Sequence, residues 1–272
     1  MTFLSRAIGL TAAGLLSHSV LADCTYTASR SGEVDAAGVR KVIVAVHAGD
    51  LVVAGNSGAK LVRANGEACA STKRVLDAIR LEVRRDGDTA YVTAQRPGRD
   101  ISFETATLDL KVEVPTTVEL EVTDSSGDID VRRVAAVRID DSSGDQRVRD
   151  IGGDVSVQDS SGDIDISNVE GNVSVRDSSG DIVISNVARN VTIPVDSSGD
   201  ITIRGVRGSV HILSDSSGGI AIYDVEQDVL IDDDGAGDIR VVNVGGNFTV
   251  RNDGSGHIKH SGVRGKVSLP RD

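Results

Sequence analysis

The six letters DSSGDI at residues 159–164 recur in close variants through the second half of the chain at an almost fixed spacing. Each variant ends its turn in a glycine, called here the marker glycine. Successive marker glycines are 17, 18, 18, 19, 19, 19 and 19 residues apart. A period of this length is typical of solenoids and other repeat folds. The marker glycines are Gly127, Gly144, Gly162, Gly180, Gly199, Gly218, Gly237 and Gly256.

Apolar residues hold fixed positions after each marker glycine. The second position is isoleucine except at Gln146, and the fourth is valine or isoleucine except at His260. The seventh is always valine or isoleucine, and a second alternating pair, such as Val173 and Val175, follows a short spacer. Period-two alternation of β-branched residues between turns predicts β-strands and excludes helices.

Each unit is compatible with either one hairpin or one coil of a solenoid. Only a coil lays identical residues directly over their copies in the next unit, as the constant columns require. At about 3.3 Å per residue, such a coil is a flattened ring, and neighbouring coils lie about 4.8 Å apart. We therefore predict an all-β fold, a two-faced parallel β-solenoid (β-helix) with about eight coils of 17–19 residues.

The first 22 residues have the pattern of a signal peptide. One positive charge, Arg6, precedes an apolar run at residues 7–16 that is too short for a permanent membrane anchor. Small residues precede a cleavage site after Ala22. We expect an exported protein, periplasmic or extracellular, which is soluble after cleavage and has no transmembrane anchor.

Residues 23–107 follow the repeat less closely. Residues 41–53 resemble one degenerate coil, and residues 68–80 carry apolar residues at the spacing of one short helix. Strands are expected on both sides of the Asp-Gly-Asp turn at residues 86–88. Because the end strands of a solenoid otherwise invite pairing, we interpret this region as an irregular N-terminal cap on the β-solenoid of residues 108–272.

The sequence contains two cysteines, Cys24 and Cys69. In the oxidising compartment expected for an exported protein, one disulfide between them is the default. Two unpaired buried thiols are the alternative. The disulfide ties the N-terminal cap together.

The composition limits the partners. The chain has 29 basic and 41 acidic residues and a formal net charge of −12. This balance argues against binding to nucleic acid or to an anionic membrane surface. With no Trp, three Tyr and three Phe, aromatic platforms for stacking sugars or bases are largely missing.

The repeated [ST]-G-D-I-x-[IV]-x-x-V core and the L-x-V-x-V-P segment at residues 110–115 resemble a known family. With the signal peptide, they are similar to the bacterial exported proteins known as putative adhesins. These contain β-strand repeats and are otherwise of unknown function. The resemblance covers roughly residues 42–269. It implies a repeat fold and an adhesin-like surface role.

Candidate catalytic residues are few. His257 and His260, with Lys259 and Asp253, are the one set of unlike residues in the last unit. The two histidines are three apart, so in a strand they point to opposite faces, and polar capping is the preferred interpretation. The serine pairs occupy turns without a histidine beside them. We predict no catalytic residue and no cofactor.

An aspartate starts the turn of every unit, and it is expected to accept backbone N–H bonds from the residues just ahead. Two interpretations stay open: turn chemistry alone, or a weak multisite Ca²⁺ ladder that bridges the protein to anionic envelope polymers. The first aspartate column is Asp124, Asp141, Asp159, Asp177, Asp196, Asp215, Asp234 and Asp253. The second aspartate column, one residue past the marker glycine, is Asp128, Asp145, Asp163, Asp181, Asp200 and Asp238.

These features predict a non-enzymatic exported envelope or surface protein that works as an adhesin-like interaction scaffold. Its partner, a protein or an envelope polymer, is not identified by the sequence. A polysaccharide-active β-helix enzyme is one alternative. An exported regulatory or stress-related binding module is another.

Overall fold

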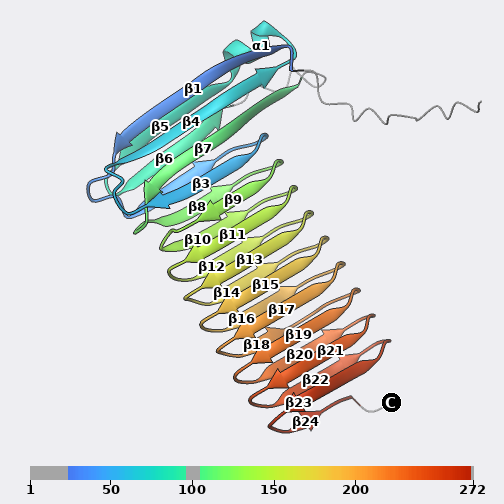
Figure 1. Ribbon diagram of the computed structural model, residues 1–272. Helices are drawn as coiled ribbons and strands as arrows, with labels where there is room; N and C mark the ends of the chain where they lie inside the picture. Colours follow the sequence, from blue (N-terminus) through green and yellow to red (C-terminus); the bar gives the residue numbers. More distant parts are fainter. Residues whose placement is uncertain (1–23, 96–104, 271–272) are drawn as a thin grey trace, which may run out of the picture.

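The computed structural model describes residues 24–95 and 105–270. Within these residues, two twelve-stranded sheets face each other along one long axis, and the coils follow one another like rungs (Figure 1). One short helix, α1 (Lys73–Ala78), lies at the N-terminal end. The predicted all-β parallel solenoid is confirmed. The predicted signal peptide lies outside the described residues.

The first sheet, called sheet A, starts with antiparallel strands and continues with parallel ones. In spatial order it consists of β1 (Tyr26–Asp35), β4 (Leu61–Ala70), β7 (Ala106–Pro115), β3 (Leu51–Asn56), β9 (Ile129–Arg132), β11 (Gln146–Ile151), β13 (Ile164–Val169), β15 (Ile182–Val187), β17 (Ile201–Val206), β19 (Ile220–Val225), β21 (Ile239–Val244) and β23 (Ile258–Val263).

The opposing sheet, called sheet B, is parallel except for its first pair. In spatial order it consists of β5 (Arg80–Asp86), β6 (Thr89–Gln95), β2 (Lys41–Ala45), β8 (Glu119–Thr123), β10 (Ala136–Asp140), β12 (Val155–Gln158), β14 (Val173–Arg176), β16 (Val191–Val195), β18 (Val210–Ile212), β20 (Val229–Asp234), β22 (Phe248–Asp253) and β24 (Val267–Ser268).

Equivalent residues of successive units are direct neighbours in each sheet. Ile164 pairs with Ile182, and Ile182 pairs with Ile201. The alternation then decides burial: Ile184 is fully buried, whereas the side chain of Val183 is 41% exposed. Stacked valine and isoleucine side chains from both sheets therefore form one continuous core between the sheets.

The marker glycines are required by both conformation and space. Gly180 has φ of +136°, in the region that side chains disfavour. A Cβ atom on Gly180 would lie 2.0 Å from the carbonyl oxygen of Gly162 in the preceding coil. No side chain fits where the turns stack this closely, so the glycine recurs once in each unit.

The first coils do not stack in chain order. Strands β2 and β3 form one coil, and this coil lies between the one made by β6 and β7 and the one made by β8 and β9. Leu51 of β3 thus pairs with Leu110 on one side and with Ile129 on the other. The segment that resembled a degenerate coil is a full member of the stack, inserted between coils distant in sequence.

Antiparallel strands and α1 cover the N-terminal end. The Oγ1 atom of Thr72 accepts the N–H of Val75 at 3.3 Å and caps the helix start. Val75, Leu76 and Ile79 are buried. At the helix end, the Arg30 guanidinium donates to the carbonyl oxygens of Ile79 and Leu76, each at 2.8 Å. The helix lies inside the range where the sequence indicated one.

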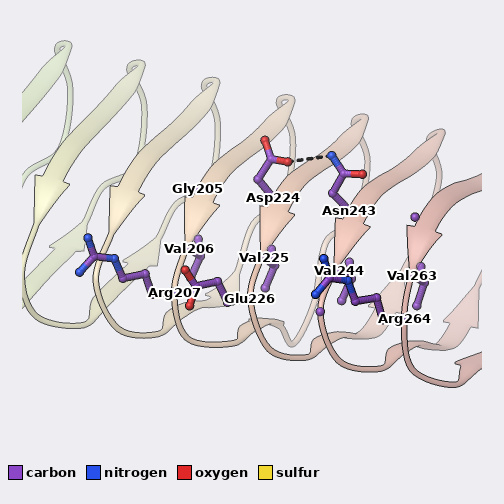
Figure 2. Close-up of a pocket in the computed structure, with 12 residues that line it drawn as sticks. Gly205, Val206, Arg207, Asp224, Val225, Glu226, Asn243, Val244, Val263 and Arg264 are labelled. Carbon is purple, nitrogen blue, oxygen red and sulfur yellow. Dashed lines mark hydrogen bonds between the residues drawn. The ribbon is translucent and has the colours of Figure 1, made fainter.

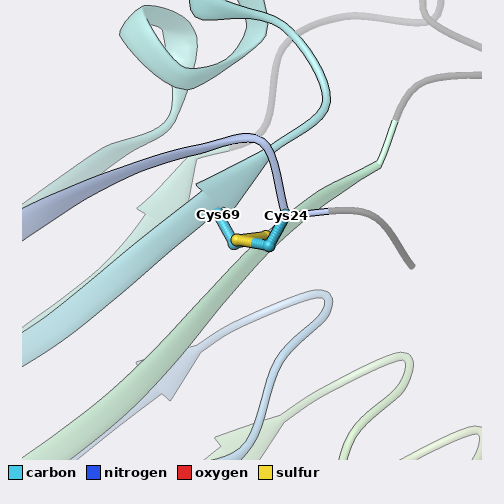
Figure 3. The surroundings of a disulfide bond; sticks show 2 residues. All are labelled: Cys24 and Cys69. Atoms are coloured by element: carbon cyan, nitrogen blue, oxygen red, sulfur yellow. A yellow bond between two sulfur atoms is a disulfide. The ribbon is translucent and has the colours of Figure 1, made fainter. Parts of the chain in front are cut away.

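The predicted disulfide between Cys24 and Cys69 is present (Figure 3). Its two Cα atoms are 5.4 Å apart, which is ordinary for a disulfide. The bond joins the start of the chain to β4 beside the paired residues Thr27 and Cys69. It closes the covered end of the solenoid.

No helix in residues 24–95 or 105–270 is long and apolar enough to cross a membrane.

The burial pattern predicts opposite outcomes for two neighbouring substitutions. Ile184→Asp places a carboxylate inside the apolar stack, and burying it without a partner costs several kcal/mol. Val183→Asp places the same group on the solvent face, where we expect a change below about 0.5 kcal/mol. Urea denaturation of both variants measures the difference. Equal stability of the two variants would contradict the assigned faces.

Candidate functional site

Each coil turns twice, and both corners carry columns of polar residues. The corner that leads from sheet B into sheet A holds the first aspartate column. Seven of its eight members are buried, from Asp124 to Asp234, with 0 to 3% of their surface exposed. Only Asp253 in the last coil is partly open. The column therefore lies inside the turns and does not line an exposed edge.

In the first four units the aspartate has the predicted turn role. The Oδ1 atom of Asp124 accepts the backbone N–H of Ser125 at 2.6 Å, and Asp159 accepts that of Ser160 at 2.7 Å. Asp141 and Asp177 accept from the next serine in the same way. Burial still raises the pKa of these carboxyl groups, and the N–H bonds offset part of the rise.

The second aspartate column has a role that the sequence did not reveal. Its side chains are exposed, and each Oδ1 accepts the backbone N–H of the equivalent residue in the next coil. Asp145 accepts from Asp163 at 3.1 Å, and Asp163 accepts from Asp181 at 2.9 Å. The run reaches Gly219, which receives no side chain to continue it. These carboxylates are inter-coil acceptors, and one oxygen of each is left toward solvent.

A metal site is not evident. In the described part of the chain, no group of three or more His, Cys, Asp or Glu side chains is placed to hold a metal ion. His257 hydrogen-bonds with Asp238, whereas the ring of His260 lies 5.9 Å from that of Phe248. The candidates of the last unit are thus not brought together. The Ca²⁺ ladder stays a prediction.

The opposite corner leads from sheet A into sheet B, and one residue there adopts a left-handed conformation in every unit. Asn168 and Asn186 have φ near +58°, and the amide of Asn186 donates to the Oδ1 atom of Asn168 at 3.1 Å. The column is Arg133, Asp150, Asn168, Asn186, Gly205, Asp224, Asn243 and Gly262. Its polar side chains fill this corner in the first half of the solenoid.

In the second half, glycines replace some of these side chains and leave a hollow of about 1020 Å³, called here the corner groove. Gly205, Gly245 and Gly262 open it across the four coils from β17 to β23, and valines form its floor. In Figure 2, Arg207, Glu226 and Arg264 lie along one side of the groove, and the hydrogen-bonded pair of Asp224 and Asn243 lies along the other. The lining residues are Gly205, Val206, Arg207, Asp224, Val225, Glu226, Asn243, Val244, Gly245, Gly262, Val263 and Arg264.

The sequence contained a signal for this groove that was not used. Gly205 and Gly262 interrupt a column of polar residues, and Gly245 interrupts the position two residues further on. Loss of a side chain at a fixed repeat position indicates a hollow, but only once the stacking places those positions side by side.

One polar cluster breaks the outer face of sheet B. The Nε2 atom of His211 lies 2.8 Å from Asp232, whose other oxygen lies 2.8 Å from Arg251. Across the described residues, no Ser, Thr or Cys side chain is hydrogen-bonded to His211. The sequence analysis missed this cluster, because its members come from different columns of three coils.

Comparison with known proteins gives a family match. The model of the family described as Toastrack DUF4097 matches residues 22–187. The search of curated proteins found no match.

The search of solved structures found several similar chains. A putative adhesin from Bacteroides fragilis NCTC 9343 is 14% identical, with a TM-score of 0.44, and the match covers 90% of this chain and 97% of that one. A putative lipid binding protein from Parabacteroides distasonis ATCC 8503 is 15% identical, with a TM-score of 0.41 and coverage of 90% and 97%. A putative cell adhesion protein from Clostridium sporogenes ATCC 15579 is 12% identical, with a TM-score of 0.32 and coverage of 91% and 100%.

The two aspartate columns predict how cations act on stability. We expect millimolar CaCl₂ and NaCl of equal ionic strength to shift the melting temperature equally, because the first column is buried and the second is engaged in N–H bonds. Calorimetry in the two salts measures this. A larger rise in calcium, lost in a variant with Asp145, Asp163 and Asp181 changed to Asn, would instead establish the cation ladder on the exposed column.

Proposed function

The chain belongs to the Toastrack DUF4097 family, and from this membership we propose that it is an exported, non-enzymatic interaction scaffold of the cell envelope that holds an extended partner in its corner groove. Export is supported by the signal-peptide pattern of the first 22 residues. The disulfide between Cys24 and Cys69 fits the oxidising compartment that such a leader implies.

The corner groove is the observation that carries this proposal. It crosses four coils, so its outer members lie three coil steps apart, roughly 14 Å at about 4.8 Å per step. A partner that fits it is elongated and runs along the solenoid axis. A protein segment or a polymer chain has this shape.

The charges along the groove indicate which groups it would hold. Arg207 and Arg264 are exposed, and neither forms an ion pair within the described residues. Guanidinium groups bind carboxylates and phosphates through two parallel hydrogen bonds. Glu226 lies between them and makes the surface mixed rather than uniformly basic. An extended partner that carries spaced anionic groups complements this arrangement, as an anionic envelope polymer does.

Gly205→Asn tests the groove without disturbing the fold. Asn168 and Asn186 already occupy this position in the two preceding coils, at φ values within about 12° of the +69° of Gly205. The new Cβ would lie 3.2 Å from the Oδ1 atom of Asn186, which the new amide can use as an acceptor. We expect unchanged or slightly higher stability, by up to about 1 kcal/mol, and a filled groove.

Binding is measured by calorimetry with polygalacturonate, an extended polymer of carboxylate sugars, as the probe. We expect Gly205→Asn and the Arg207→Ala/Arg264→Ala double variant to weaken binding at least tenfold. Arg240→Ala, which removes an exposed charge from the outer face of sheet A, serves as the matched control. Neutral dextran should not bind.

Two outcomes would contradict the proposal. Equal binding by all variants would place the interaction elsewhere on the surface. Release of new reducing ends from the polymer would show that the protein is an enzyme.

A further inference from the structure

The last coils differ from the earlier ones in how the first aspartate column is held. In the 18-residue unit, four positions separate Val173 from Asp177. In the 19-residue units, one more residue is present, so that five positions separate Val191 from Asp196. The same extra residue precedes Asp215 and Asp234.

The extra residue draws the aspartate into the backbone ladder. Asp196 and Asp215 form an isolated parallel bridge, as do Asp215 and Asp234. The N–H of Ser216 donates to the backbone carbonyl oxygen of Asp196 at 3.1 Å, and the N–H of Gly235 donates to that of Asp215 at 2.9 Å. In the shorter unit the equivalent N–H, that of Ser178, donates to the Asp177 carboxylate.

These carboxyl groups therefore lose their donors while they stay buried. Asp196, Asp215 and Asp234 are 0, 2 and 1% exposed, and neither oxygen of any of the three has a hydrogen-bond partner. They lie on adjacent coils, which are about 4.8 Å apart.

No positive charge compensates this stretch. The charged groups that act on the three carboxyls are all acidic: Asp177 and Asp181 from the preceding coil, Asp253 from the following one, and Asp233 beside Asp234. Three adjacent ionised carboxylates without donors are strongly disfavoured in such a site, because burial penalises each charge and the charges repel one another. Binding a proton removes both penalties. It also supplies an O–H donor for the neighbouring carboxyl.

We propose that Asp196, Asp215 and Asp234 form a proton-sharing ladder, in which a neutral carboxyl donates its O–H to the carboxyl of the adjacent coil, so that the stability of the C-terminal coils depends on pH. The proton comes from solvent, and no covalent bond of the chain is made or broken. The ladder lies at the corner opposite the corner groove, and it does not rest on the function proposed above.

The direction of the pH dependence follows from the pKa values. Burial first, then the neighbouring carboxyls, raises the pKa of Asp215 to about 7, and those of Asp196 and Asp234 to about 6. Because the unfolded chain titrates near 3.8, the folded state binds more protons between pH 4 and 7. Stability from the ladder is therefore fully present below about pH 4, falls as the pH rises, and is lost above about pH 7.

Asp215→Asn tests the ladder, because the amide keeps the shape of the side chain and cannot ionise. We expect the melting temperature of the unaltered protein to fall between pH 5 and pH 7.5. The variant should melt several degrees higher at pH 7.5 and show a shallower pH dependence. Asp140→Asn, which removes an exposed carboxylate, is the matched control and should leave the pH dependence unchanged.

Infrared spectroscopy reads the protons directly. At pH 6 the unaltered protein should show the carbonyl band of neutral carboxyl groups, and the Asp196→Asn/Asp215→Asn/Asp234→Asn variant should lose most of it. Absence of that band at pH 6, or a melting temperature independent of pH from 5 to 7.5, would overturn the proposal. A rise in melting temperature that requires calcium at pH 7.5 and disappears in the triple variant would also overturn it, since a cation would then hold the carboxyls.

Discussion

The backbone ladder between successive coils is the constraint on which the rest of the structure depends. It places each residue directly on its copy in the next unit, as with Ile164, Ile182 and Ile201. For apolar residues this stacking is favourable at every step, because each side chain buries its neighbour. For the marker glycines it leaves no room for a side chain, since a Cβ on Gly180 would meet the carbonyl oxygen of Gly162. One repeated geometry thus explains both the apolar columns and the glycine column.

The same stacking is costly for charged residues, and the fold answers this cost in different ways. Asp159 is buried but accepts a serine N–H, whereas Asp163 is exposed and accepts the N–H of the next coil. Asn186 extends a row of side-chain amides at the opposite corner. Asp215 has neither a donor nor exposure, because one added residue per unit gives the donor to the ladder. Proton sharing is the remaining way to stabilise it.

Specific features arise where the repeat is interrupted. Gly205 removes a side chain from a filled corner and begins the corner groove, and Gly262 continues it in the last coil. A regular column offers every coil the same surface, so it supports length but not distinction between partners. Interruptions such as Gly205, Arg207 and Glu226 make one stretch of the solenoid chemically different from the others.

The sequence by itself determined the coil, its turns and the disulfide. Period-two alternation and a constant 17–19-residue spacing admit few folds, and two cysteines allow one pairing. Only the tertiary structure decided that the coil containing Leu51 lies between coils distant in sequence, since any coil with the same apolar pattern can occupy that place. It alone also decided that Asp215 is buried without a donor and that glycines from separate units meet in one groove. Those properties depend on which backbone N–H serves the ladder and on what stacks beside each residue, and neither is written within a single repeat.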